Sequence, residues 1–248
     1  MIETFVLKLL VGIAMMWLLM PRKEVTDGFF RIQMLVALGL SVLLVLIVSS
    51  ETAIQNRFFC IAQVTSAFVA FAGHILWKLG RRWSGVIAIY LIAFLSFLSL
   101  FDMSCAGGLD RRSLQVLLSN TTSSAVLGAA FTSMLLGHWY LTTPTMSIGP
   151  LSWLTRAMAI AAVGRLLMTG LSFGLFGLAT HSLVHLLWLV LRILGGIVVP
   201  LVTAVVVARI LRYRNTQSAT GVLFAALILV FMGEMAAALL ERDLRIPY

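Results

Sequence analysis

Residues 29–49 read FFRIQMLVALGLSVLLVLIVS, and this stretch alone indicates the class of protein. Arg31 is its one charged residue, and the segment from Met34 to Val48 carries no charge at all. An α-helix needs about 20 predominantly apolar residues to cross the hydrocarbon core of a bilayer. The stretch therefore predicts a transmembrane helix.

The rest of the chain has the same character. Of its 248 residues, 61% are hydrophobic and 11% are charged, whereas about a quarter of the residues in soluble domains are charged. Similar apolar runs predict eight transmembrane helices, at about 4–20, 29–49, 58–79, 83–101, 122–143, 151–178, 183–210 and 217–240. A count of seven or nine stays open. We expect an all-α, polytopic integral membrane bundle, with residues 1–248 forming one transmembrane domain.

One predicted connection is longer than the others, an outer loop over residues 102–121. Asp110 could cap a short interfacial helix there, with Leu109, Leu114 and Leu117 on its apolar face. Cys105 in this loop and Cys60 at the start of the third helix fall on the same side of the membrane. They either form a disulfide that pins the loop or are two unrelated free thiols.

The formal net charge of +9 points to membrane lipids as partners and not to nucleic acid. The basic residues stand beside helix ends, where they set topology and contact lipid headgroups. One side collects ten of them and the other six: Arg22, Lys23, Arg31, Lys78, Arg81, Arg82, Arg156, Arg209, Arg212 and Arg214 against Lys8, Arg57, Arg111, Arg112, Arg242 and Arg245. Because cytoplasmic loops are the more basic ones, we expect both termini outside, in the inner membrane of a bacterium.

Three ionisable residues lie well inside apolar segments: Arg165, Arg192 and Glu234. A charge at the bilayer centre costs about 2.5–3.5 kcal/mol, so such residues usually pair or line a polar cavity. Arg192 and Glu234 are equally far from the turn near residue 213, which predicts an ion pair between two antiparallel helices. The pair either only locks the helices together or forms, with Arg165, a pocket for a carboxylate, a quinone oxygen or a haem propionate.

Four histidines complete the candidate residues. His181 and His185 stand four apart at the start of the seventh helix, where they could bind a metal or act as plain interfacial anchors. His74 and His138 each follow a glycine and each lie near the same end of their helix, so they share a predicted depth. At that depth they could ligate one haem b iron from both sides, contact a quinone, relay a proton, or belong to an interfacial aromatic belt.

Three functions account for these residues. The first is a redox subunit that binds haem b or a quinone and passes electrons to a partner subunit. The second is a permease for a small solute, lined by Arg165, Arg192 and Glu234. The third is a non-catalytic accessory or assembly subunit of a membrane complex. Walker, HExxH, CxxC and serine-elbow motifs are absent from the sequence, so it indicates no particular enzyme.

The segment LGGIVVP, at residues 194–200 of the predicted seventh helix, resembles the membrane anchors of quinol-linked oxidoreductases. Together with the predicted count of eight helices, this resemblance implies a quinol-linked membrane subunit, and its residues cover this one helix. It carries no site residue over to this chain.

Overall fold

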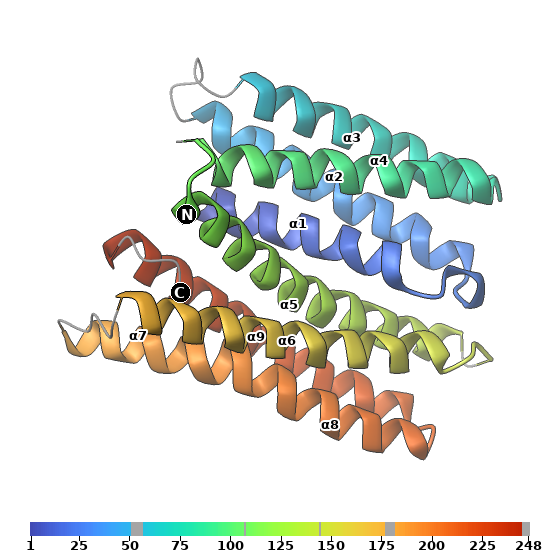
Figure 1. Cartoon of the computed structure of the whole chain (residues 1–248). Coiled ribbons are helices and arrows are strands. Elements are labelled where there is room, and N and C mark those ends of the chain that lie inside the picture. Colours follow the sequence, from blue (N-terminus) through green and yellow to red (C-terminus); the bar gives the residue numbers. More distant parts are fainter. Residues whose placement is uncertain (51–56, 107, 144, 177–181, 245–248) are drawn as a thin grey trace.

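The computed structural model describes residues 1–50, 57–106, 108–143, 145–176 and 182–244, and this part of the chain is all helical (Figure 1). It contains eight helices, seven of which are long and apolar enough to cross a membrane. The predicted fold class is therefore confirmed. Two parts of the prediction lie outside the described residues. They are the end of the predicted sixth helix, residues 177 and 178, and Arg245, which was predicted to flank the eighth helix.

The helices have the following bounds: α1 Ile2–Leu19, η1 Arg22–Glu24, α2 Asp27–Ser50, α3 Arg57–Lys78, α4 Arg82–Ser104, α5 Arg111–Thr142, α6 Gly149–Phe176, α7 Leu183–Ile193, η2 Leu194–Val198, α8 Val199–Arg212 and α9 Thr216–Leu244. The elements α7, η2 and α8 follow one another without a break and together make one membrane-length helix, Leu183–Arg212. The one helix outside the set of seven is α5, whose mid-section is rich in serine and threonine.

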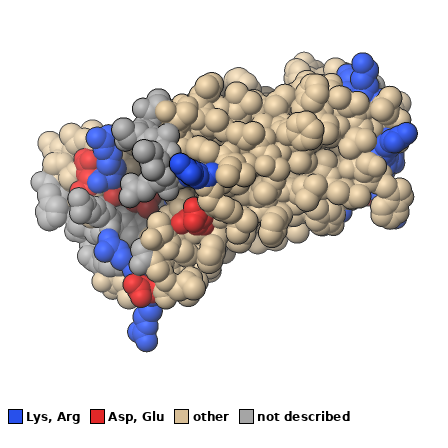
Figure 2. All heavy atoms as spheres, turned by 90° about the horizontal axis from the view of Figure 1, so that it is seen from above, with Lys and Arg blue, Asp and Glu red and all other residues tan. Residues whose placement is uncertain are grey.

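Successive helices run in opposite directions, so the chain's ends and connections gather at two ends of the bundle (Figure 1). Met1 and Leu244 lie at the same end, here called the terminal end. The opposite end, here called the basic end, holds the connections after α1, α3, α5 and α8. Seen from above, the visible acidic side chains gather toward the terminal end. The charged residues visible at the basic end are all lysine or arginine (Figure 2). Which end faces the cytoplasm stays a prediction.

α1 and α5 lie between two groups of helices, with α2, α3 and α4 on one side and α6 to α9 on the other (Figure 1). They cross at two glycines. A Cβ atom added to Gly12 would overlap the backbone of Ser124 and Gly128, and one added to Gly128 would overlap the backbone of Gly12. Small residues of this kind let membrane helices approach closely and gain packing energy.

The predicted loop over residues 102–121 is wrong, because α4 extends to Ser104 and α5 already begins at Arg111. The polar residues that suggested an interfacial helix are the first turns of α5. Their polar groups are satisfied inside the bundle: Asn120 donates to the Ser104 hydroxyl at 3.0 Å, and Ser124 donates to the Asn120 carbonyl at 2.8 Å. Asp110 directly precedes α5 but makes no capping hydrogen bond. Cys60 and Cys105 are free thiols.

The glycine contact between α1 and α5 generates a prediction. Gly12→Leu should lower the thermal unfolding midpoint of the detergent-purified protein strongly, because overpacking a tight contact costs about 1–3 kcal/mol or more. Gly39→Leu is the matched control, since a Cβ atom on Gly39 of α2 meets nothing within 4 Å. Equal midpoints for the two variants would contradict the close contact.

Candidate functional site

The strongest candidate site is a cluster of three charged side chains, Arg165 of α6, Arg192 of α7 and Glu234 of α9. They are 1%, 0% and 3% exposed, respectively. Serines of α5 complete the cluster, so four helices meet there. Burial this complete inside a membrane bundle is tolerated only where each charge finds partners.

Glu234 is the centre of the cluster. One of its carboxylate oxygens, Oε1, accepts a hydrogen bond from Arg192 Nη1 and lies 4.0 Å from Arg165 Nε. The other oxygen, Oε2, accepts from the Ser123 hydroxyl. The predicted ion pair between Arg192 and Glu234 is therefore present, and Arg165 shares the same carboxylate.

Arg165 is also anchored to α5. Its Nη1 donates to the Ser119 carbonyl at 2.9 Å and to the Ser119 hydroxyl at 2.6 Å. Ser119 and Ser123 stand one turn apart on α5, so this single helix bonds both to an arginine and to the glutamate. The serine-rich section of α5 thus faces the charges and not the lipid.

The local backbone explains how Arg192 reaches Glu234. Two residues after Arg192 the helix widens into the π-turn η2, and Pro200 follows in the first turn of α8. A proline ring clashes with the carbonyl four residues earlier, here that of Gly196, and a π-turn relieves such a clash by widening the helix. Turns of this type often lie at functional sites.

Glycines bring this widened helix close to α9. A Cβ atom on Gly195 would overlap the Leu229 carbonyl oxygen, and one on Gly233 would overlap the Gly196 backbone. A Cβ atom on Gly196 would also overlap Nη1 of Arg192. The glycine pair therefore makes room both for the helix contact and for the guanidinium group itself.

The cluster is not electrically neutral. Two guanidinium groups face one carboxylate, so the three side chains carry one net positive charge. Nε and Nη2 of Arg192 are buried and have no hydrogen-bond partner in the described part of the chain. Buried donors without partners typically cost about 1–3 kcal/mol each, so this edge of Arg192 is where a ligand oxygen would be stabilised.

Sequence analysis missed Lys8, which it counted among the basic residues at a helix end. In the structure Lys8 lies within α1 and is 6% exposed, and its side-chain amine makes no hydrogen bond or ion pair to any described residue. Gly12 lies against Ser124 of α5, which runs parallel to α1. Lys8 is one turn before Gly12, and Asn120 is one turn before Ser124, so Lys8 and Asn120 lie at the same depth. Ser119 and Ser123, which bond the charged cluster, flank Asn120, so Lys8 is level with the cluster. The sequence feature that could have identified Lys8 is a single lysine inside the apolar run of residues 4–20.

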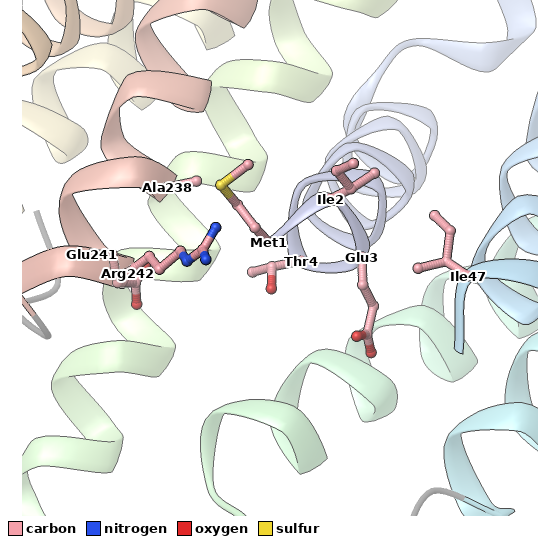
Figure 3. A pocket seen from close by; sticks show the side chains of 8 residues that line it. All are labelled: Met1, Ile2, Glu3, Thr4, Ile47, Ala238, Glu241 and Arg242. Carbon is pink, nitrogen blue, oxygen red and sulfur yellow. The ribbon is translucent and has the colours of Figure 1, made fainter. Parts of the chain in front are cut away.

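A cavity of about 640 Å³ opens at the terminal end above these charges (Figure 3). Met1, Glu3 and Thr4 of α1 line it together with Ala238, Glu241 and Arg242 of α9, so two carboxylates and one guanidinium group stand at its wall. Figure 3 shows the Arg242 side chain extending from α9 toward Met1. Thr4 precedes Lys8 by one turn, and Ala238 follows Glu234 by one turn. The cavity is therefore separated from both buried charges by about one helical turn.

The structure does not bring His74 and His138 together. His74 lies on α3, which packs against α2 and α4, and its Nδ1 is 3.0 Å from the Arg31 carbonyl oxygen. His138 is exposed on α5. The glycine before each histidine serves helix packing, because a Cβ atom on Gly73 would lie 2.8 Å from Met34 Sδ, and one on Gly137 would lie 2.9 Å from Thr220 Oγ1.

Of the other histidine pair, the structure describes only His185. His185 Nε2 lies 3.7 Å from the Asp243 carboxylate at the terminal end, and its ring lies 5.7 Å from that of Trp188. His181 lies outside the described residues. Across the residues that are described, no group of three or more His, Cys, Asp or Glu side chains could hold a metal ion.

Comparison of the chain with protein-family models, with curated proteins and with solved structures finds no match. The function must therefore be inferred from the site itself.

The shared carboxylate generates a second prediction. Glu234→Leu should lower the free energy of unfolding by about 3–5 kcal/mol, because it leaves two buried guanidinium groups without their carboxylate. Arg192→Leu should cost less, because Glu234 keeps Arg165 as a partner. Thermal or denaturant unfolding in detergent measures both.

Asp243→Leu is the control for this comparison, since Asp243 lies on the same helix but is exposed at its end. It should leave stability nearly unchanged. A larger loss for Arg192→Leu than for Glu234→Leu would show that Glu234 does not hold the cluster together.

Proposed function

We propose that this protein is a membrane permease that binds a small carboxylate-bearing solute at Arg192. The proposal is carried by one observation, the unbonded Nε and Nη2 donors of a fully buried arginine. The surplus positive charge of the cluster and the Lys8 amine at the same depth support an anionic solute over a neutral or cationic one.

The geometry of the unbonded donors favours a carboxylate. Nε and Nη2 occupy one edge of a guanidinium group, where their N–H bonds point in the same direction. This edge matches the two oxygens of a carboxylate, and such bidentate pairs are stronger and more specific than single charge contacts. The other side of the group is already used, since Nη1 binds Glu234.

A permease also needs a path and a means of opening. The cavity at the terminal end supplies the start of a path, one turn from Glu234 and Lys8. The glycine contacts and the π-turn beside Arg192 supply a helix pair that can shift without breaking large side-chain contacts. We infer that α6 to α9 move relative to α1 and α5 and thereby expose the Arg192 edge. This movement breaks the hydrogen bonds of Ser119 and Ser123 to the cluster and keeps the Arg192–Glu234 ion pair.

A variant that keeps the charge and removes the bidentate edge tests this function. Sodium lactate, benzoate and succinate should raise the unfolding midpoint of the purified protein above sodium chloride of equal ionic strength. Arg192→Lys should abolish that rise and the uptake of the stabilising carboxylate into liposomes. Arg209→Lys, on the exposed basic end of α8, is the matched control and should retain both. The proposal fails if no carboxylate stabilises the protein, or if both variants respond alike.

The redox hypothesis, with haem b or a quinone as cofactor and a partner subunit as electron acceptor, stays a prediction. Its haem form has less support, because it requires His74 and His138 on neighbouring helices. We expect no haem bands in a reduced-minus-oxidised spectrum of the purified protein. Sharp bands that disappear in both His74→Ala and His138→Ala would overturn this expectation and favour the redox subunit over the permease.

A further inference from the structure

A second candidate site lies at the basic end, outside the charged cluster. A cavity of about 530 Å³ opens there between α6 and α8. Three arginines line it: Arg156 from α6, Arg212 at the end of α8 and Arg214 in the turn that follows. Three cations around one cavity repel one another unless an anion lies between them.

None of these arginines is neutralised within the described residues. Their side chains make no ion pair or hydrogen bond there, and no described acidic residue lines the cavity. The Glu24 carboxylate accepts a hydrogen bond from the Ser147 hydroxyl at 2.5 Å and lies beside Gly149, which lines the cavity, so one carboxylate stands against three guanidinium groups. The cavity is therefore a positively charged site at the level of a membrane surface, where anionic headgroups are found.

An apolar groove adjoins the arginine cavity. This groove, of about 370 Å³, runs along α6 next to α1 and is lined by Met15, Leu19, Trp153 and Ile160. Arg156 lines both the groove and the cavity. A cationic side chain at the mouth of an apolar groove matches a molecule with an anionic head and a hydrocarbon tail.

We propose that this surface binds one phospholipid with an anionic headgroup. Its phosphate lies between Arg156, Arg212 and Arg214, and one acyl chain lies in the groove along α6. Arginine suits phosphate because its planar donor fork contacts two oxygens at once. The site is independent of the carboxylate permease, since it shares no residue with the charged cluster.

Lipid titration of the delipidated protein tests the site. Dioleoyl phosphatidylglycerol should raise the unfolding midpoint and bind in native mass spectrometry, and dioleoyl phosphatidylcholine should do neither. The triple variant Arg156→Gln, Arg212→Gln and Arg214→Gln should weaken phosphatidylglycerol binding roughly tenfold or more at low salt. Lys23→Gln, Lys78→Gln and Arg81→Gln together form the matched control, because they remove three exposed charges from the same end. That control should bind as the wild type does.

A second variant tests the acyl chain. Ala157→Phe places a ring in the apolar groove and should weaken phosphatidylglycerol binding while the three arginines stay intact. Glycerol phosphate, which carries an anionic phosphate without a tail, should not replace the lipid.

Three results would overturn the proposal: equal binding of phosphatidylcholine, equal losses in the two triple variants, or full stabilisation by glycerol phosphate alone. The last result would identify a site for a soluble phosphate and not for a lipid.

Discussion

The structure depends on the cost of leaving a charge unpaired in hydrocarbon. Two arginines and one glutamate are buried where each isolated charge would cost several kcal/mol. Among the described residues, Glu234 is the one carboxylate that pairs with both arginines. Because the four participating helices each supply a partner, the cluster fixes their relative depth and rotation more tightly than apolar packing could. Lipid tails compete with apolar side chains on nearly equal terms, whereas they cannot replace a carboxylate.

That electrostatic contact exists only because backbone atoms come close. The charged groups are bonded over short distances, and short distances between helices require residues without large side chains. Gly195, Gly196 and Gly233 meet this need between η2 and α9, as Gly12 and Gly128 do between α1 and α5. The π-turn before Pro200 then widens the helix at the point where Arg192 must turn toward Glu234. The ion pair between Arg192 and Glu234 therefore depends on the glycines, which let the two helices approach, and on the π-turn before Pro200, which widens the helix beside Arg192.

The sequence predicts correctly at which depth in the membrane a residue lies, but it does not predict which helices are neighbours. Counting residues from a turn is enough to set Arg192 level with Glu234, because each residue of a helix advances the chain by a fixed 1.5 Å. The same counting sets His74 level with His138, but it cannot tell that α3 and α5 belong to different parts of the bundle. The early start of α5 was missed for a related reason. Residues 111–121 are too polar for a helix that faces lipid, and only the central position of α5 makes their hydroxyl and amide groups an advantage.

The environment of Lys8 follows only from its position in the sequence and the packing of its helix taken together. Its place in the sequence fits a snorkelling residue near a membrane surface, and only the contact between Gly12 and Ser124 sets it beside the buried section of α5. A third cation at that level makes the surroundings of Glu234 more positive than the ion pairs alone suggest. The buried, unbonded guanidinium edge of Arg192 is costly in the absence of an anion. A protein that needed only to lock its helices would be more stable with fewer cations there, so the surplus charge supports the proposed binding of an anion.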